Sequence, residues 1–259
     1  MRLNIRHLVF GLAAGAGLAA TAASAEDAKP TPEFTINGGA TLVSDYRFRG
    51  ISQTDRNWAI QGTATVTHKS GFYISFWSSS VDDYVTASGQ GHQELDLIAG
   101  YKKAIGHTTV DLGLLYYVYP KTKLPGDQSS SNFAEPYFDV AETFGPVTAK
   151  ATINYAPKQK ALALDQIGPP KHDNVYLAGD LSAAIPKTPI GLTAHLGHTF
   201  GPSWLSIGKG YTDWNLGATV TWKAFTFGLQ YVDTDGTFIT PSGKNAAGSG
   251  VVGSIGVSF

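Results

Sequence analysis

Short and long connections alternate strictly along this chain, and they join segments in which apolar residues alternate with polar ones. Twelve segments have this period of two residues, and most reach the length of about ten residues that a tilted strand needs to cross a membrane. The segments lie at 34–48, 58–68, 71–80, 92–102, 107–117, 133–144, 146–156, 174–184, 190–200, 213–222, 224–232 and 250–259. The short connections are 69–70, 103–106, 145, 186–189 and 223–224, and the long ones lie near 49–57, 81–91, 118–132, 157–173, 201–212 and 233–249.

This sorting of the connections predicts the fold class. A barrel of the bacterial outer membrane has an even number of antiparallel strands, short turns at its periplasmic end and longer loops at its external end. A soluble sandwich has no reason to sort its loops by end. The sequence therefore predicts an all-β, transmembrane, antiparallel up-and-down β-barrel of about twelve strands.

Each segment also has one apolar face and one polar face. Between Trp214 and Trp222, one face reads Trp, Leu, Ala, Val, Trp and the other reads Asn, Gly, Thr, Thr. This alternation alone does not say whether the apolar face meets lipid or forms a soluble core. Aromatic residues at the segment ends favour lipid, because aromatic girdles lie at both membrane interfaces. The candidate interface anchors are Trp58, Trp214, Trp222 and Phe259.

Glu142 departs from this pattern, because it falls on the apolar face of its segment together with Phe138 and Val140. A charge that faces lipid at the membrane midplane costs about 2–4 kcal/mol. We therefore expect Glu142 to lie near an interface, or a bulge to shift the register.

The N-terminus has the pattern of a secretory signal. Two arginines precede an apolar run at 8–20, which is shorter than the ~20 residues that span a bilayer, and Ala23-Ser24-Ala25 fits a small-x-small cleavage site. We expect residues 1–25 to be cleaved off as a signal peptide, and residues 26–259 to be exported through the periplasm and to form a single outer-membrane barrel.

The composition excludes several other classes of protein. The chain has no cysteine, which excludes a disulfide framework and thiolate metal sites. Without the leader, the formal charge falls from −1 to −3, so a nucleic-acid partner is not implied.

The last segment is expected to pair with the first and close the ring, because lipid satisfies no open sheet edge. Phe259 ends this segment on the same face as Val257 and Ile255. By resemblance to other outer-membrane barrels, a terminal phenylalanine is the signal that the barrel-assembly machinery reads.

Two motifs in the first third of the chain resemble a known family. Residues 44–54 read SDYRFRGISQT, and residues 70–82 read SGFYISFWSSSVD. Both look like the TorF-type porin family of proteobacterial outer-membrane proteins, and the rest of the chain matches mainly in its strand pattern and its terminal phenylalanine. The resemblance implies a small outer-membrane barrel that passes small solutes, and it supplies no catalytic residues.

If the apolar faces meet lipid, the opposite faces line the barrel interior. Their charged residues are Arg47, Arg49, Glu94, Asp96, Asp111, Asp139, Lys150, Asp180 and His195. Strand direction places the first four near the external mouth and the other five near mid-height, where the ring is net acidic. Charge rings set selectivity in pores, so this arrangement favours cations or zwitterions over anions. The alternative is that the charges pair across a filled interior and only hold the barrel closed.

No metal-binding or catalytic set stands out. His195 and His198 are three residues apart, which places them on opposite faces of a strand, so they cannot chelate one ion together. No spacing of serine, histidine and acidic residues nominates a catalytic triad. We therefore expect no metal, no cofactor and no enzymatic reaction.

Two functional hypotheses follow. The first is a porin, monomeric or oligomeric, that lies among outer-membrane lipid and lipopolysaccharide and lets small hydrophilic solutes diffuse through. The second is a closed barrel that acts as an enzyme, or as a binding and adhesion scaffold through its external loops. The sequence leaves open the solute, and whether the loops at 118–132 and 157–173 fold inward as a constriction.

Overall fold

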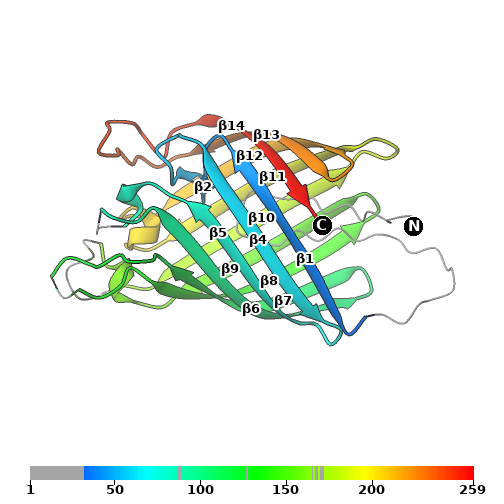
Figure 1. The fold of residues 1–259 in the computed structure, drawn as a ribbon, viewed down its shortest axis with the longest axis horizontal. Helices are drawn as coiled ribbons and strands as arrows, with labels where there is room; N and C mark the ends of the chain where they lie inside the picture. The colour runs from blue at the N-terminus through cyan, green and yellow to red at the C-terminus, as the bar shows by residue number, and fades with distance from the viewer. Residues whose placement is uncertain (1–31, 87–88, 127, 165, 167–168, 170–171) are drawn as a thin grey trace.

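Twelve antiparallel strands close into one barrel, as the sequence predicts (Figure 1). The computed structural model describes residues 32–86, 89–126, 128–164, 166, 169 and 172–259, so the predicted signal at 1–25 lies outside the described residues. The strands of the barrel are β1 (Phe34–Val43), β4 (Ala59–His68), β5 (Phe72–Ser80), β6 (Gln93–Ile105), β7 (Thr108–Val118), β8 (Phe133–Phe144), β9 (Val147–Ala156), β10 (Asn174–Ala184), β11 (Ile190–Phe200), β12 (Tyr211–Trp222), β13 (Phe225–Thr234) and β14 (Gly250–Ser258). In the described part of the chain, every helix is too short or too polar to cross a membrane.

The connections sort by end as predicted. The five short ones lie together at one end of the barrel, which we call the short-turn end, and the six long ones lie at the other, the long-loop end (Figure 1). Eleven of the predicted segments agree with a strand to within three residues at each end.

The predicted end of the first segment is wrong: the prediction places it at residue 48, whereas β1 ends at Val43. The chain then turns into the barrel, and β2 (Arg47–Phe48) pairs with β3 (Ile51–Ser52) in a separate two-stranded hairpin. Arg49 and Gly50 form its two-residue turn with φ values of 47° and 79°. Positive φ at both central positions is what the twist of a tight hairpin requires.

The hairpin is held at its base by a buried carboxylate. Asp45 accepts hydrogen bonds of 2.6 Å from Ser52 Oγ and of 2.6 Å from Arg47 Nε. The Arg47 guanidinium also donates to the backbone carbonyls of Ala246 and Gly248, at 3.0 and 2.9 Å. The hairpin is therefore tied to the connection between β13 and β14.

The first and last strands form the closing seam of the barrel, which confirms the predicted pairing. In Figure 1 the blue β1 lies beside the red β14, and their register pairs Ala40 with Val257 and Leu42 with Ile255. Beyond the last residue of β14, Gly38 and Phe259 exchange two backbone hydrogen bonds of 3.2 and 3.0 Å.

The outer face of the barrel is apolar. Every one of the twelve strands exposes at least one large apolar side chain outward, such as Ile74, Leu216 and Leu229 at 69, 63 and 61%. Contiguous apolar patches on soluble monomers rarely exceed a few hundred Å². This outer face is therefore the kind of surface that lipid covers.

The predicted interface anchors lie on this outer face. Trp58 is exposed beside the long-loop end, and Trp222 and Phe259 are exposed at the short-turn end. Trp214 faces outward near the long-loop end and is half-buried.

Glu142 also faces outward, two residues before the end of β8 at the short-turn end. Its carboxylate accepts a hydrogen bond from the hydroxyl of Thr108, the first residue of β7. The register of β8 continues through this position without a bulge. Glu142 therefore lies at the end of the barrel wall, which was one of the two expected solutions.

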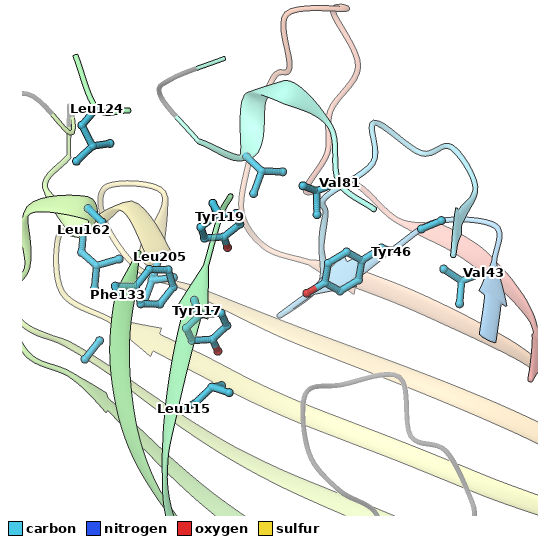
Figure 2. Packing of buried hydrophobic residues seen from close by; sticks show 14 residues of the cluster. Val43, Tyr46, Val81, Leu115, Tyr117, Tyr119, Leu124, Phe133, Leu162 and Leu205 are labelled. Carbon is cyan, nitrogen blue, oxygen red and sulfur yellow. The ribbon is translucent and has the colours of Figure 1, made fainter. Parts of the chain in front are cut away.

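An apolar core fills the interior at the long-loop end. Figure 2 shows Leu115, Tyr117 and Phe133 of the barrel strands together with side chains of the loops. The rings of Tyr117 and Phe133 stack with their centroids 4.2 Å apart. Leu124 and Leu162 are buried in the same core, so the connections after β7 and after β9 fold inward at these residues.

Candidate functional site

A cavity of about 200 Å³ lies between the hairpin and the short-turn end, and we call it the lumen cavity. Its wall includes Thr109, Thr148 and Thr226, each the second residue of a strand that begins at a short turn. At its other end it reaches Tyr46 and Arg47. The lumen cavity therefore occupies the half of the barrel that the apolar core leaves free.

One side of the barrel interior carries a continuous row of ionisable side chains, one from each of the seven consecutive strands β6 to β12. We call this row the charged arc, and all of its members except Asp213 line the lumen cavity. It consists of Lys102, Asp111, Asp139, Lys150, Asp180, His195 and Asp213.

The lysines of the charged arc lie within reach of its carboxylates. Lys102 Nζ is 2.9 Å from Asp111 Oδ2. Lys150 Nζ is 3.2 Å from Asp180 Oδ2 and 4.0 Å from Asp139 Oδ2. The two lysines thus compensate part of the negative charge of the four aspartates of the arc.

His195 lies between two carboxylates of the same arc. Its Nδ1 is 2.7 Å from Asp180 Oδ1, and its Nε2 is 3.0 Å from Asp213 Oδ1. A carboxylate only accepts hydrogen bonds, so both ring nitrogens donate in the imidazolium form that fits this geometry.

The opposite side of the interior is uncharged. Strands β13, β14, β1, β4 and β5 complete the ring, all of their residues are described, and none of their inward side chains carries a charge. They present Gln230, Ser254, Thr41, Gln61 and Thr63 to the lumen cavity. A solute in the cavity therefore meets charged groups on one side and hydroxyl and amide groups on the other.

On the charged side of the interior, two glycines of the barrel wall leave room for the side chains of neighbouring tyrosines. A Cβ at Gly197 would come within 2.0 Å of Tyr176 Oη, and one at Gly113 within 2.5 Å of Tyr137 Oη. A larger residue at either position would push its tyrosine out of place. In the position that Gly197 permits, the ring of Tyr176 contacts the guanidinium of Arg49.

Arg49, at the tip of the hairpin, reaches across the barrel to β8. Its Nη2 donates to both oxygens of Glu135, at 2.8 Å each. The guanidinium also lies 4.1 Å from the ring centroid of Tyr176 and 4.8 Å from that of Phe48. The hairpin is thereby fixed as a partition across the interior, with the lumen cavity on one side.

Glu94 and Asp96 lie within the apolar core rather than at an open mouth, where the sequence places them. Glu94 accepts hydrogen bonds of 2.7 Å from the hydroxyls of both Tyr46 and Tyr119. Asp96 is 1% exposed, and its Oδ1 has no hydrogen-bond partner among the described residues. The reason for the difference is that the hairpin and the loops fold inward and cover these positions.

The structure therefore separates the nine predicted interior charges into two groups. Asp111, Asp139, Lys150, Asp180 and His195 meet in the charged arc, whereas Arg47, Arg49, Glu94 and Asp96 belong to the hairpin and the apolar core.

Three further interior charges were not among the predicted residues. Lys102, Glu135 and Asp213 each pair with a predicted residue. Each lies an even number of residues from a polar residue on the inward face of its strand, Lys102 from Asp96, Glu135 from Asp139 and Asp213 from Asn215, so strict application of the period-two rule would have found them. Among the described residues, no group of three histidine or acidic side chains is arranged to hold a metal ion.

Comparison with known proteins assigns the chain to a family. The family described as bacterial protein of unknown function (Gcw_chp) matches residues 27–253. The chain belongs to this family. The resemblance of this Gcw_chp chain to the TorF-type porin family stays a prediction. No curated protein matches the chain in sequence.

Solved structures show where the Gcw_chp barrel belongs among folds. The NanC porin is similar with a TM-score of 0.57 and 12% identity, over 87% of this chain and 99% of the porin. A chain from a study of in-meso crystallization of membrane proteins has a TM-score of 0.50 and 8% identity, over 86% of this chain and 83% of its own. The outer-membrane channel DcaP of Acinetobacter baumannii has a TM-score of 0.46 and 11% identity, over 87% of this chain and 97% of its own. At these identities the likeness is one of fold, and the fold is that of outer-membrane porins.

Proposed function

We propose that this Gcw_chp chain is a channel of the bacterial outer membrane through which small hydrophilic solutes diffuse without a chemical step. The lumen cavity carries the proposal, because charged and polar side chains line a space inside a closed barrel, and every strand of that barrel exposes apolar side chains on its outer face. In this proposal the outer face contacts lipid and lipopolysaccharide, the long loops are external, and the barrel-assembly machinery inserts the exported chain.

The charged arc supports small zwitterions as the preferred solutes, with cations second. Lys102, Asp111, Lys150 and Asp180 offer both signs of charge on neighbouring strands. A solute with both an ammonium and a carboxylate group can satisfy both signs, whereas an anion or a cation alone must compete with the existing pairs.

The hairpin stands between the lumen cavity and the long-loop end, so passage requires it to move. Its tip is held by the Arg49–Glu135 ion pair, and its base by Asp45. We therefore propose that the channel is closed in the conformation described and opens when the hairpin leaves its position.

Conductance of the refolded protein in planar lipid bilayers tests the proposed channel. We expect discrete openings, and a reversal potential in a salt gradient that favours cations over anions. An absence of openings at all voltages and salt concentrations would defeat the channel.

A pair of substitutions tests the contribution of the charged arc. Asp139→Asn with Asp180→Asn leaves Lys150 without either carboxylate, so we expect the preference for cations to fall or reverse. Asp82→Asn with Asp83→Asn is the matched control, because it removes two carboxylates from a loop outside the lumen cavity. If both double variants shift the reversal potential equally, the arc does not set selectivity.

A further inference from the structure

A second cavity, of about 270 Å³, lies at the long-loop end, and we call it the loop cavity. It shares no lining residue with the lumen cavity. All six long connections contribute to its wall. One contributor from each, in chain order, is Phe48, Tyr84, Ser131, Leu164, Trp204 and Phe238.

Most of the residues that line the loop cavity are apolar or aromatic. Seven of its eighteen lining residues are aromatic, and none of the described residues that line it carries a charge. Small-molecule sites in proteins have this character, with mostly hydrophobic walls and a few placed polar groups. The lumen cavity differs, because charged side chains from six strands line it.

Ser131 and Tyr211 contribute buried hydroxyl groups to this wall that no other described residue uses. Ser131 and Tyr211 are each 2% exposed, and their hydroxyl oxygens have no hydrogen-bond partner among the described residues. The other tyrosines of the wall differ, since Tyr84 donates to the backbone carbonyl of Ser52 and Tyr119 donates to Glu94. A buried hydroxyl without a partner is unfavourable unless a bound molecule supplies one.

We propose that the loop cavity binds an uncharged small molecule with an aromatic ring and polar substituents that hydrogen-bond to Ser131 and Tyr211. An apolar cavity of about 150 Å³ accommodates benzene, so the larger loop cavity has room for a substituted ring. A charged ligand is disfavoured, because no described group of the wall replaces the water that its charge would lose. The proposal does not rest on conduction, because the loop cavity is present while the hairpin holds the position described.

Binding of two matched fluorinated probes tests the proposal. The protein is refolded in phosphatidylcholine nanodiscs, and the fluorine NMR signal of 4-fluorobenzamide is followed during titration. We expect line broadening beyond that of empty nanodiscs, and its reversal by excess unlabelled benzamide. The probe 4-fluorobenzoate has the same shape with a negative charge, and we expect it to show no such reversible broadening.

Substitution of the two hydroxyls tests where the probe binds. Tyr211→Phe combined with Ser131→Ala should weaken binding of 4-fluorobenzamide by at least about fivefold, as expected for one lost hydrogen bond. Tyr231→Phe removes a hydroxyl from the outer face and is the matched control, expected to bind as the unsubstituted protein does. Heat-modifiable migration confirms that each variant is folded, and Tyr211→Phe alone is used if the double variant is not.

Three results would overturn the proposal. They are a lack of competition by benzamide, equal binding of the benzoate probe, and equal affinity in the folded hydroxyl variant and the control.

Discussion

Arg49 holds the tip of the hairpin by contacts that lie almost entirely out of water. Its side chain is 6% exposed and that of its partner Glu135 is 0% exposed. Tyr117 also donates to Glu135, at 3.2 Å. Because both charges have lost their water, each depends on the other for its electrostatic stabilisation.

Replacing Arg49 by Ala should therefore destabilise the folded barrel. The substitution leaves Glu135 buried without its cation, a change that costs about 3–5 kcal/mol in buried ion pairs. The measurement is the temperature at which the folded band disappears in heat-modifiable migration.

Arg49→Met with Glu135→Met is the control, because it removes both charges and leaves apolar side chains of similar length. We expect this double variant to be more stable than Arg49→Ala. If it is equally unstable, the buried charge of Glu135 is not the cause.

Asp55 ties the chain between β3 and β4 to the connection at 235–249. Its carboxylate accepts a 2.8 Å hydrogen bond from Thr240, and it lies 3.1 Å from Lys244 Nζ. Burial acts to raise the pKa of Asp55, but hydrogen bonds from Ser242, Thr240 and Lys244 outweigh burial and hold this pKa below its ordinary value of 3.8.

This lowered pKa predicts an acid-sensitive attachment of the connection at 235–249. Because the folded pKa lies below the unfolded one, the stabilisation is complete above the ordinary value of 3.8 and is lost as the pH falls through the folded value. Hydrogen exchange of the amides at 238–248, corrected for the intrinsic effect of pH, should accelerate only in that acid range. Asp55→Asn should abolish the pH dependence and Asp82→Asn should preserve it, and the opposite result would contradict the assignment.

At the scale of elements, the hairpin of β2 and β3 separates two cavities of different chemistry. Arg47 lines the lumen cavity, whereas Phe48 and Ile51 line the loop cavity. This alternation follows from strand geometry, since successive side chains point to opposite faces. A four-residue sheet thereby forms a wall that is polar on one side and apolar on the other.

Replacing residues 46–53 by a short Gly-Ser linker should open the barrel. The linker removes the wall between the cavities and both arginine contacts, so we expect single-channel conductance to rise several-fold. Arg56→Gln is the control, because exposed Arg56 bonds to the carbonyls of Asn245 and Gly248 in the same connection without crossing the interior. Unchanged conductance in the linker variant would show that the hairpin is not the barrier.

At the scale of the whole molecule, closure depends on the seam between β1 and β14. The ring of Phe259 lies over Gly38 on the outer face, and a Cβ at Gly38 would come within 2.6 Å of its Cζ atom. The absence of a side chain at Gly38 is what lets the aromatic ring pack against the seam.

Gly38→Val should therefore impair assembly by displacing the ring of Phe259. Overpacking of this kind costs about 1–3 kcal/mol. The measurement is the folded fraction after refolding into lipid vesicles. In a Phe259→Ala background the valine should have no further effect, because the ring that it displaces is gone. Additive effects of the two substitutions would contradict this contact.

Much of the barrel was determined by the sequence alone. Strand positions, the sorting of loops and the pairing of β1 with β14 follow from the period of two residues and from the rule that lipid tolerates no open edge. These are local or general properties, so they can be read without knowing which distant residues meet. The same rule turns Asp111, Lys150 and His195 toward the interior, and in the structure these residues line the lumen cavity.

Only the tertiary structure decided how the interior is divided. The pattern of residues 44–48 continues that of β1, yet this segment leaves the wall because its polar groups are satisfied inside the barrel. Arg49 meets Glu135 across 86 positions of sequence, and Arg47 meets Ala246 across 199. Contacts at such separations depend on how the closed barrel brings distant loops together, and alternation along a single strand carries no information about them.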